Sequence, residues 1–136
     1  MKRLLLPAFA VLGILAAAAP VFAHHAFAAE YDSNKPISLR GKLTKVEWVN
    51  PHGWIYLNVT DDSGRVTSWA VETGSPNALL RRGLRKTDFP EGIEIVVEGF
   101  RAKNGGTSIN GTSVKLPDGR NLLTGSSGNG APGGRE

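Results

Sequence analysis

Hydrophobic and polar residues alternate along several segments of the chain, and alternation with a period of two is typical of strands with one buried face. In "ISLRGKL", residues 37–43, every second residue from Ile37 is apolar or glycine, and the residues between them are polar. The same pattern recurs downstream, separated by turn-forming segments at 61–64, 103–106 and 117–120. We therefore expect five strands, in residues 37–48, 53–60, 65–72, 93–100 and 108–116.

The first of these strands carries two irregularities. Its alternation slips by one residue toward Val46 and Trp48, which indicates a β-bulge. Gly41 lies in the middle of the strand and indicates a sharp bend, as at the corner of a barrel.

One helix is predicted, between the third and fourth strands. Ser75 can cap a helix, Pro76 suits its first position, and Gly83 suits its end. Three strands, a short helix and two further strands follow the order of an OB-fold, a five-stranded Greek-key barrel. We therefore expect a mostly β protein with a small five-stranded OB-like barrel over residues 37–124 and one short helix between strands 3 and 4. A β-sandwich or a meander is the alternative.

The first 23 residues have the pattern of a secretory signal peptide. Lys2 and Arg3 give a basic start, an uncharged run follows, and small or aliphatic residues precede a cleavage position after Ala23. The run is shorter than the about 20 apolar residues that a membrane span needs. Cleavage after Ala28 also fits the pattern and would remove two adjacent histidines. We expect cleavage after Ala23, a periplasmic or secreted protein, and no membrane span in the mature chain.

Composition and charge restrict the picture further. We expect an N-terminal arm over residues 24–36 and disorder in the Gly-rich residues 125–136, which cannot offset the entropy of folding. The chain has no cysteine and a formal net charge of only +4, without a long basic run. We therefore expect neither a disulfide framework nor a nucleic-acid partner.

Four stretches carry a resemblance to a known family: HHAFAAEYD, KVEWVNPHGWIYLNV, WAVETGSPNALLRRG and VEGFRAKNG. In this order they resemble a family of small exported bacterial proteins known only as a domain of unknown function, over nearly the whole mature chain. NPHGW and GSPNALLRRG are the most specific parts, and Leu84 stands where members of the family often carry an aromatic residue. The resemblance implies export and a small β-rich domain but no activity, so the function has to be argued from individual residues.

All three histidines lie in two segments: His24 and His25 at the expected mature N-terminus, and His52 in the turn between the first two strands. The α-amine and ring of an N-terminal histidine can chelate one ion. His52 would complete a nitrogen-rich site together with a carboxylate such as Glu30, Asp32 or Glu47. Such a site suits Cu(II) first, and then Ni(II) or Zn(II). The alternative is that the N-terminal pair touches nothing and that His52 only hydrogen-bonds within its turn.

Three aromatic residues, Trp54, Tyr56 and Trp69, are assigned to the outer face of the second and third strands. In OB-folds this face is the usual ligand platform, and aromatic rings stack on flat partners. An exported protein or a glycan is then the expected partner. The alternative is that Phe27 and Tyr31 of the arm fold over these rings as a satellite core, which would also carry the N-terminal histidines toward His52.

No pattern indicates an enzyme. Cysteine is absent, Ser75 stands outside a G-x-S-x-G elbow, and the carboxylates show no pairing. The sequence therefore predicts an exported, non-enzymatic binding module. It is either a Cu(II)-type metal binder that uses His24, His25 and His52, or a metal-free OB-like module that binds a protein or a glycan on its aromatic face.

Overall fold

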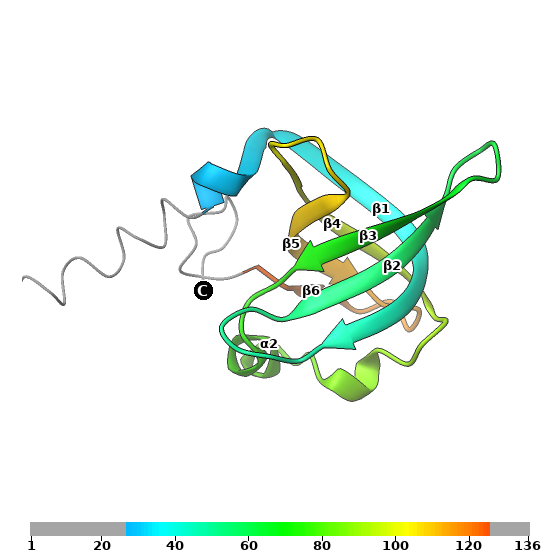
Figure 1. Ribbon diagram of the computed structural model, residues 1–136. Coiled ribbons are helices and arrows are strands. Elements are labelled where there is room, and N and C mark those ends of the chain that lie inside the picture. Colours follow the sequence, from blue (N-terminus) through cyan, green and yellow to red (C-terminus); the bar gives the residue numbers. More distant parts are fainter. Residues whose placement is uncertain (1–26, 126–136) are drawn as a thin grey trace, which may run out of the picture.

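The structure is a computed structural model, and it describes residues 27–125 of the 136-residue chain. The expected signal peptide, His24, His25 and residues 126–136 of the expected tail lie outside the described residues. Figure 1 shows a strongly curved sheet with short helices beside it. Residues 27–30 are helical. The elements that follow are β1 (Tyr31–Glu47), β2 (Trp54–Thr60), β3 (Val66–Glu72), α2 (Pro76–Arg81), η1 (Lys86–Asp88), β4 (Glu94–Ala102), β5 (Ser108–Lys115) and β6 (Asn121–Leu123).

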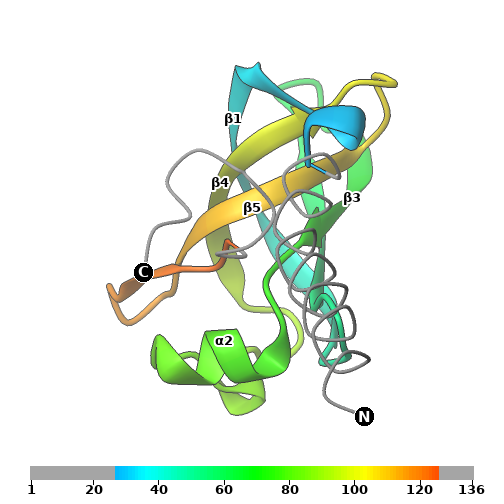
Figure 2. The ribbon, with the colours of Figure 1, turned by 90° about the vertical axis from the view of Figure 1, so that its left-hand side faces the viewer.

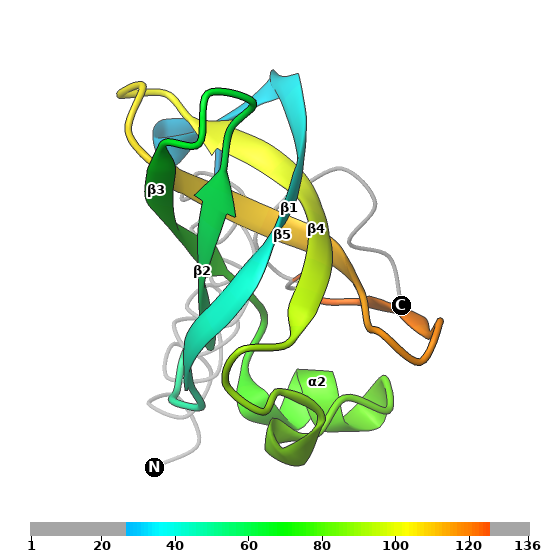
Figure 3. The same cartoon turned by 90° about the vertical axis from the view of Figure 1, so that its right-hand side faces the viewer.

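The strands form one sheet in the order β3-β2-β1-β4-β5-β6, in which neighbours are antiparallel. β3 also pairs with β5, in a parallel sense, through Ala70–Ser108, Val71–Ile109 and Glu72–Asn110. The pairings of β1 to β5 therefore run in a ring β1-β2-β3-β5-β4, in which each strand has two neighbours, and β5 pairs in addition with β6 (Figure 3). The protein is mostly β, as predicted, with the predicted helix between its third and fourth strands.

β1 is the longest strand because its two neighbours pair with different parts of it. β4 pairs mainly with its first part and β2 with its last part. Its register with β2 shifts between Leu43 and Lys45, which confirms the predicted bulge. A Cβ atom on Gly41 would lie 2.4 Å from the carbonyl oxygen of Asn58. Glycine is therefore required where β2 crosses closest to this strand.

The core is apolar and is built by the inward faces of the paired strands. Ile55, Leu57, Ile95 and Val97, which the alternation assigns to the buried face, are all buried. They belong to one cluster to which the segment after β3 adds Leu79, Leu84 and Phe89. The alternation of apolar residues along β2 and β4 therefore identifies their buried faces correctly.

The signals at Ser75 and Gly83 act as predicted. The Ser75 hydroxyl accepts a hydrogen bond from the backbone N–H of Ala78 at 3.3 Å, and Pro76 begins α2. Gly83 follows the helix with a φ of 87°, a left-handed conformation that favours glycine. Because Leu79 and Leu84 are buried in the core, α2 and the turn after it close one end of the strands, away from the helical residues 27–30 (Figure 2).

Two parts of the fold differ from the prediction. β1 begins at Tyr31, inside the expected arm, and pairs Tyr31 with Ala102 and Pro36 with Phe100. Residues 32–35 are polar, so alternation could not indicate this pairing. The short β6 pairs with β5 and was not predicted, since three residues are too few for a periodic pattern. Within residues 27–125, no helix is both long and apolar enough to cross a membrane.

Candidate functional site

The β1–β2 loop, which carries His52, is hydrogen-bonded to the residues at the end of β3. The N–H of Gly53 donates to the carbonyl of Gly74 at 3.0 Å, and the N–H of Thr73 donates to the carbonyl of Gly53 at 2.9 Å. A Cβ atom on residue 53 would lie 2.7 Å from Oγ1 of Thr73, which is buried. Glycine at position 53 therefore allows the β1–β2 loop to approach β3, and this approach brings His52 to the last residue of that strand.

The imidazole of His52 faces two acceptors through one ring nitrogen. Its Nδ1 lies 3.0 Å from Oε1 of Glu72 and 3.2 Å from the carbonyl oxygen of Thr73. The side chains of His52 and Glu72 are 32% and 13% exposed, respectively. A carboxylate and a carbonyl both accept hydrogen bonds, so this environment favours a proton on Nδ1 and a lone pair on Nε2.

The second oxygen of Glu72 is held by a tyrosine. The hydroxyl of Tyr31 donates to Oε2 of Glu72 at 2.5 Å. Burial, followed by the hydrogen bond to Glu72, raises the pKa of Tyr31 well above its usual range. The phenol therefore stays protonated at neutral pH and remains a donor. The carboxylate of Glu72 thus joins Tyr31 at the start of β1 to His52 in the β1–β2 loop.

Tyr31 belongs to a small second cluster with Phe27, Phe100 and Ala102. The ring of Phe27 stacks on Tyr31 and meets Phe100 edge to face, with ring centroids 5.8 Å apart in both pairs. A satellite core therefore forms, but it packs on β4 and not over Trp54, Tyr56 and Trp69, which corrects the expectation. The reason is the pairing of Tyr31 with Ala102, which sets this part of the chain against β4.

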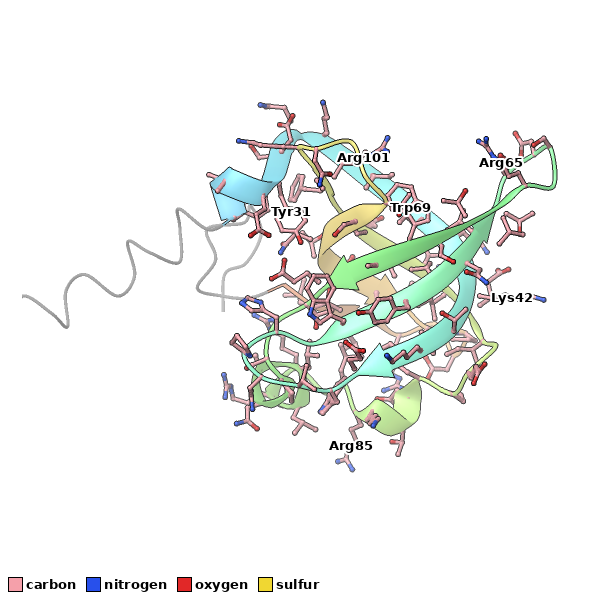
Figure 4. All side chains as sticks on the ribbon, viewed as in Figure 1. Tyr31, Lys42, Arg65, Trp69, Arg85 and Arg101 are labelled. Carbon is pink, nitrogen blue, oxygen red and sulfur yellow. The ribbon has the colours of Figure 1, made fainter. Side chains whose placement is uncertain are left out.

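The assignment of Trp69 to the outer face was wrong. Trp69 is 9% exposed and belongs to the main core. It pairs in register with Leu57 of β2, and residues directly opposite on neighbouring strands share a face. Its ring is covered by Arg101, whose guanidinium carbon lies 5.3 Å from the ring centroid (Figure 4).

Trp54 and Tyr56 lie on the outer face of β2 and are half-buried there. Trp54 stands in register between Glu47 of β1 and Glu72 of β3. The hydroxyl of Tyr56 donates to Glu47 at 3.2 Å, and Lys45 pairs with Glu47 while its ammonium lies 5.5 Å from the Tyr56 ring centroid. Partial desolvation and the hydrogen bond to Glu47 raise the pKa of Tyr56, whereas the hydrogen bond from Lys45 lowers the pKa of Glu47. The outer face of β2 is therefore an aromatic strip bordered by charged pairs.

Asn110 of β5 lies beside Glu72 of β3. The two residues are paired across the parallel β3–β5 contact, and their neighbours Val71 and Ile109 point into the core. Asn110 and Glu72 therefore share the outer face. Asn110 is nevertheless 2% exposed, and its Oδ1 has no hydrogen-bond partner among residues 27–125. An acceptor buried in this way normally receives a hydrogen bond from a donor.

Within the part of the chain that the structure describes, no group of three or more His, Cys, Asp or Glu side chains could hold a metal ion. His52 and Glu72 supply two such side chains, and the predicted partners His24 and His25 lie outside the described residues. The carboxylate beside His52 is Glu72 and not one of those expected from the sequence, Glu30, Asp32 and Glu47. Only the register of β2 with β3, which places Trp54 opposite Glu72, could have indicated this neighbour.

The fold and the site define a small, mostly β protein with a histidine–carboxylate pair at one end of an aromatic strip. A family model described as a family of unknown function, DUF6152, matches residues 11–112. The chain therefore belongs to this family, which confirms the resemblance of its motifs. No curated protein matches the sequence.

Proposed function

We propose that this chain is an exported, non-enzymatic binding module that holds a Cu(II)-type ion between its mature N-terminus and His52. The single observation that carries the proposal is the environment of the His52 ring. Nδ1 faces Glu72 and Thr73, which leaves Nε2 as the nitrogen available to a metal. In metalloproteins the ligating histidine commonly donates its other N–H to a carboxylate or a backbone carbonyl in this way.

The N-terminal segment can supply the remaining nitrogen ligands. Phe27, Tyr31, Glu72 and His52 form a continuous chain of side-chain contacts. His24 precedes Phe27 by three residues, and three residues span at most about 10 Å when extended. The α-amine and imidazoles of His24 and His25 therefore belong to a segment that joins this chain of contacts at Phe27.

The proposed ligands are nitrogen atoms from His24, His25 and His52. Imidazole and amine ligands suit Cu(II), with Ni(II) and Zn(II) as weaker competitors. Export is part of the proposal, because cleavage after Ala23 creates the free amine of His24. Metal binding requires neutral amine and imidazole groups, whose unperturbed pKa values are about 7.7 and 6.5. The affinity should therefore fall steeply as the pH drops below about 6.

We further propose that the ring of paired strands is an OB-like barrel. The order β1-β2-β3-β5-β4, with its parallel β3–β5 contact, supports this architecture. OB-folds bind their ligands on strands 2 and 3 and with the loops that join strands 1–2 and 4–5. His52 lies in the loop between β1 and β2, and Trp54 lies on β2. The proposed site thus occupies the usual ligand-binding region of that fold.

The decisive experiment has two stages. The intact mass of the exported protein gives the mature start, which we expect to be His24; a start at Ala29 would remove the proposed ligands and refute the proposal. The mature protein is then titrated with Cu(II) beside a version extended by one alanine before His24, His52→Ala and the control Val49→Ala, an exposed change in the same loop. We expect weaker binding in the first two variants and parental binding in the control. Equal affinity in all four would exclude the proposed ligand set.

The second candidate function is a metal-free module that binds a protein or a glycan through Trp54 and Tyr56. Their position on the outer face of β2 favours it, whereas the burial of Trp69 removes the third expected contact. Tryptophan fluorescence of the metal-free protein, titrated with soluble glycans, would test this function. A Cu(II)-independent change that Trp54→Ala abolishes would support it.

A further inference from the structure

We infer that Glu72 is the positioning residue of this site: it holds the His52 ring with Nδ1 protonated and Nε2 directed to the ligand, and Tyr31 fixes Glu72 in that role. The inference rests on the proposed function, and it names a residue that is not among the carboxylates expected beside His52, Glu30, Asp32 and Glu47. Glu72 would act through His52 and would not itself need to touch the ion.

The geometry of the carboxylate carries the first step. Oε1 of Glu72 contacts Nδ1 of His52 at 3.0 Å, and Oε2 accepts from Tyr31 at 2.5 Å. A rotation of the carboxylate would break one of these two contacts, so each partner restrains the other. The Glu72 side chain is also only 13% exposed, which limits the competition of water for its oxygens.

The position of Tyr31 carries the second step. Its hydroxyl is directed at Glu72, and its ring is packed against Phe27 in the second cluster. The phenol therefore cannot leave Glu72 without disrupting buried aromatic contacts. The carbonyl oxygen of Thr73, 3.2 Å from Nδ1 of His52, is a second acceptor for the same proton. The His52 ring is thus restrained by two acceptors, the backbone carbonyl of Thr73 and the carboxylate of Glu72.

The restraint has a chemical consequence for a metal. A histidine with a protonated Nδ1 binds a metal only through Nε2, and an acceptor carboxylate makes that nitrogen more basic. Loss of such an outer partner typically lowers metal affinity by about 10–100-fold. We therefore expect Glu72 to matter for affinity although it supplies no ligand atom.

The first test needs no metal. Long-range ¹H–¹⁵N correlation spectra of the metal-free protein at about pH 8, where an ordinary imidazole is neutral, report which ring nitrogen carries the proton. The His52 signals are assigned by their loss in His52→Ala. We expect a protonated Nδ1 and an unprotonated Nε2 in the parent. A parent protein with its proton on Nε2 would overturn the inference.

The second test separates Glu72 from the proposed function. Glu72→Leu removes both acceptor oxygens, Glu72→Gln keeps one, and Glu94→Gln is the control, because Glu94 lies on β4 and pairs with Arg40 at the surface. The measured properties are the Cu(II) affinity and the Cu(II) electron paramagnetic resonance spectrum. We expect the affinity to fall by about 10–100-fold for Glu72→Leu and by less for Glu72→Gln. The control should change neither the affinity nor the spectrum. If Glu72→Leu fails to fold, the Cu(II) affinity and spectrum of Glu72→Gln alone decide whether Glu72 has the inferred role.

The outcomes distinguish the two hypotheses. A parent that binds no Cu(II) overturns the proposed function and, with it, the metal role of Glu72. A parent that binds Cu(II) while both Glu72 variants keep its affinity and spectrum overturns only the role of Glu72. Reduced affinity together with a changed His52 tautomer in the Glu72 variants supports the inference.

Discussion

Replacement of Gly53 by alanine tests how the β1–β2 loop is held against β3. The added Cβ would lie 2.7 Å from Thr73 Oγ1 and 3.3 Å from the carbonyl oxygen of Gly74. The first distance is too short, and Oγ1 cannot easily move because it donates to the Gly74 carbonyl at 3.0 Å inside the protein. The loop must therefore shift away from β3 in Gly53→Ala.

The magnitude follows from two independent estimates. Overpacking of a well-packed site costs about 1–3 kcal/mol. A shift of the loop instead weakens the two backbone hydrogen bonds between Gly53 and the Thr73–Gly74 segment, each of which contributes about 0.5–1.5 kcal/mol. By either route, Gly53→Ala lowers the free energy of unfolding by about 2 kcal/mol. For a domain of this size, this corresponds to a melting temperature lower by about 8–16 °C.

A double-mutant cycle shows whether the Thr73 oxygen is the cause. Thr73→Ala removes Oγ1, so Gly53→Ala should cost clearly less in that background. Thr73→Ser keeps the oxygen and is the matched control, in which Gly53→Ala should cost as much as in the parent. The assay is chemical denaturation of the parent, the three single variants and the two double variants. If the free energies of Gly53→Ala and Thr73→Ala add within about 0.3–0.5 kcal/mol, the steric explanation is refuted.

Three further predictions concern the core, the helix and the alkaline stability. Leu57→Ala removes a side chain that is 0% exposed and should lower the free energy of unfolding by about 2–5 kcal/mol; denaturation at the parental midpoint would contradict the assigned core. Ser75→Ala removes the acceptor for Ala78 and should cost about 1 kcal/mol, and an unchanged melting temperature would place the helix start elsewhere. The pKa of Tyr31 is raised in the folded state, so above about pH 10, its ordinary value, the unfolded chain releases this proton while the folded chain keeps it. Stability therefore falls as the pH rises above about 10, and denaturation series at several pH values should show a shallower fall for Tyr31→Phe; parallel curves would contradict the buried hydrogen bond to Glu72.

Most of the fold could be predicted because its signals are local. Alternation identified β2 to β5, the parity slip at Val46 identified the bulge, and Ser75 with Gly83 marked the helix. These features depend on residues near one another in the chain. The first part of β1 could not be predicted, because the pairing of Tyr31 with Ala102 joins a polar segment to a distant strand. The local sequence around Tyr31 therefore indicates only an arm, because its strand conformation depends on pairing with β4.

The face of Trp69 shows a different limit. Trp69 alternates with Ser68 and Ala70 and shares its face with Val71, so the alternation itself favours the buried face for Trp69. A large aromatic residue suits either a core or a ligand platform. The register with Leu57 decides for the core, and register is a property of two strands together. Trp54 and Tyr56, which alternate with Ile55 and Leu57, were assigned correctly because both of those aliphatic neighbours required burial.

The candidate site depends on the kind of contact that local patterns cannot show. Glu72 is the last residue of β3, His52 lies in the β1–β2 loop, and Tyr31 begins β1. From the sequence, the carboxylates considered were Glu30, Asp32 and Glu47, each of which lies within a few residues of one of the two histidine segments. The sheet instead sets Glu72 opposite Trp54, two residues beyond His52, while the pairing of Tyr31 with β4 brings its hydroxyl to the same carboxylate. Since these two pairings involve different strands, only the closed ring of strands brings all three side chains together. Their contact therefore depends on the whole fold, and a shift of the β1–β2 loop away from β3, as expected for Gly53→Ala, should also move the His52 ring away from Glu72.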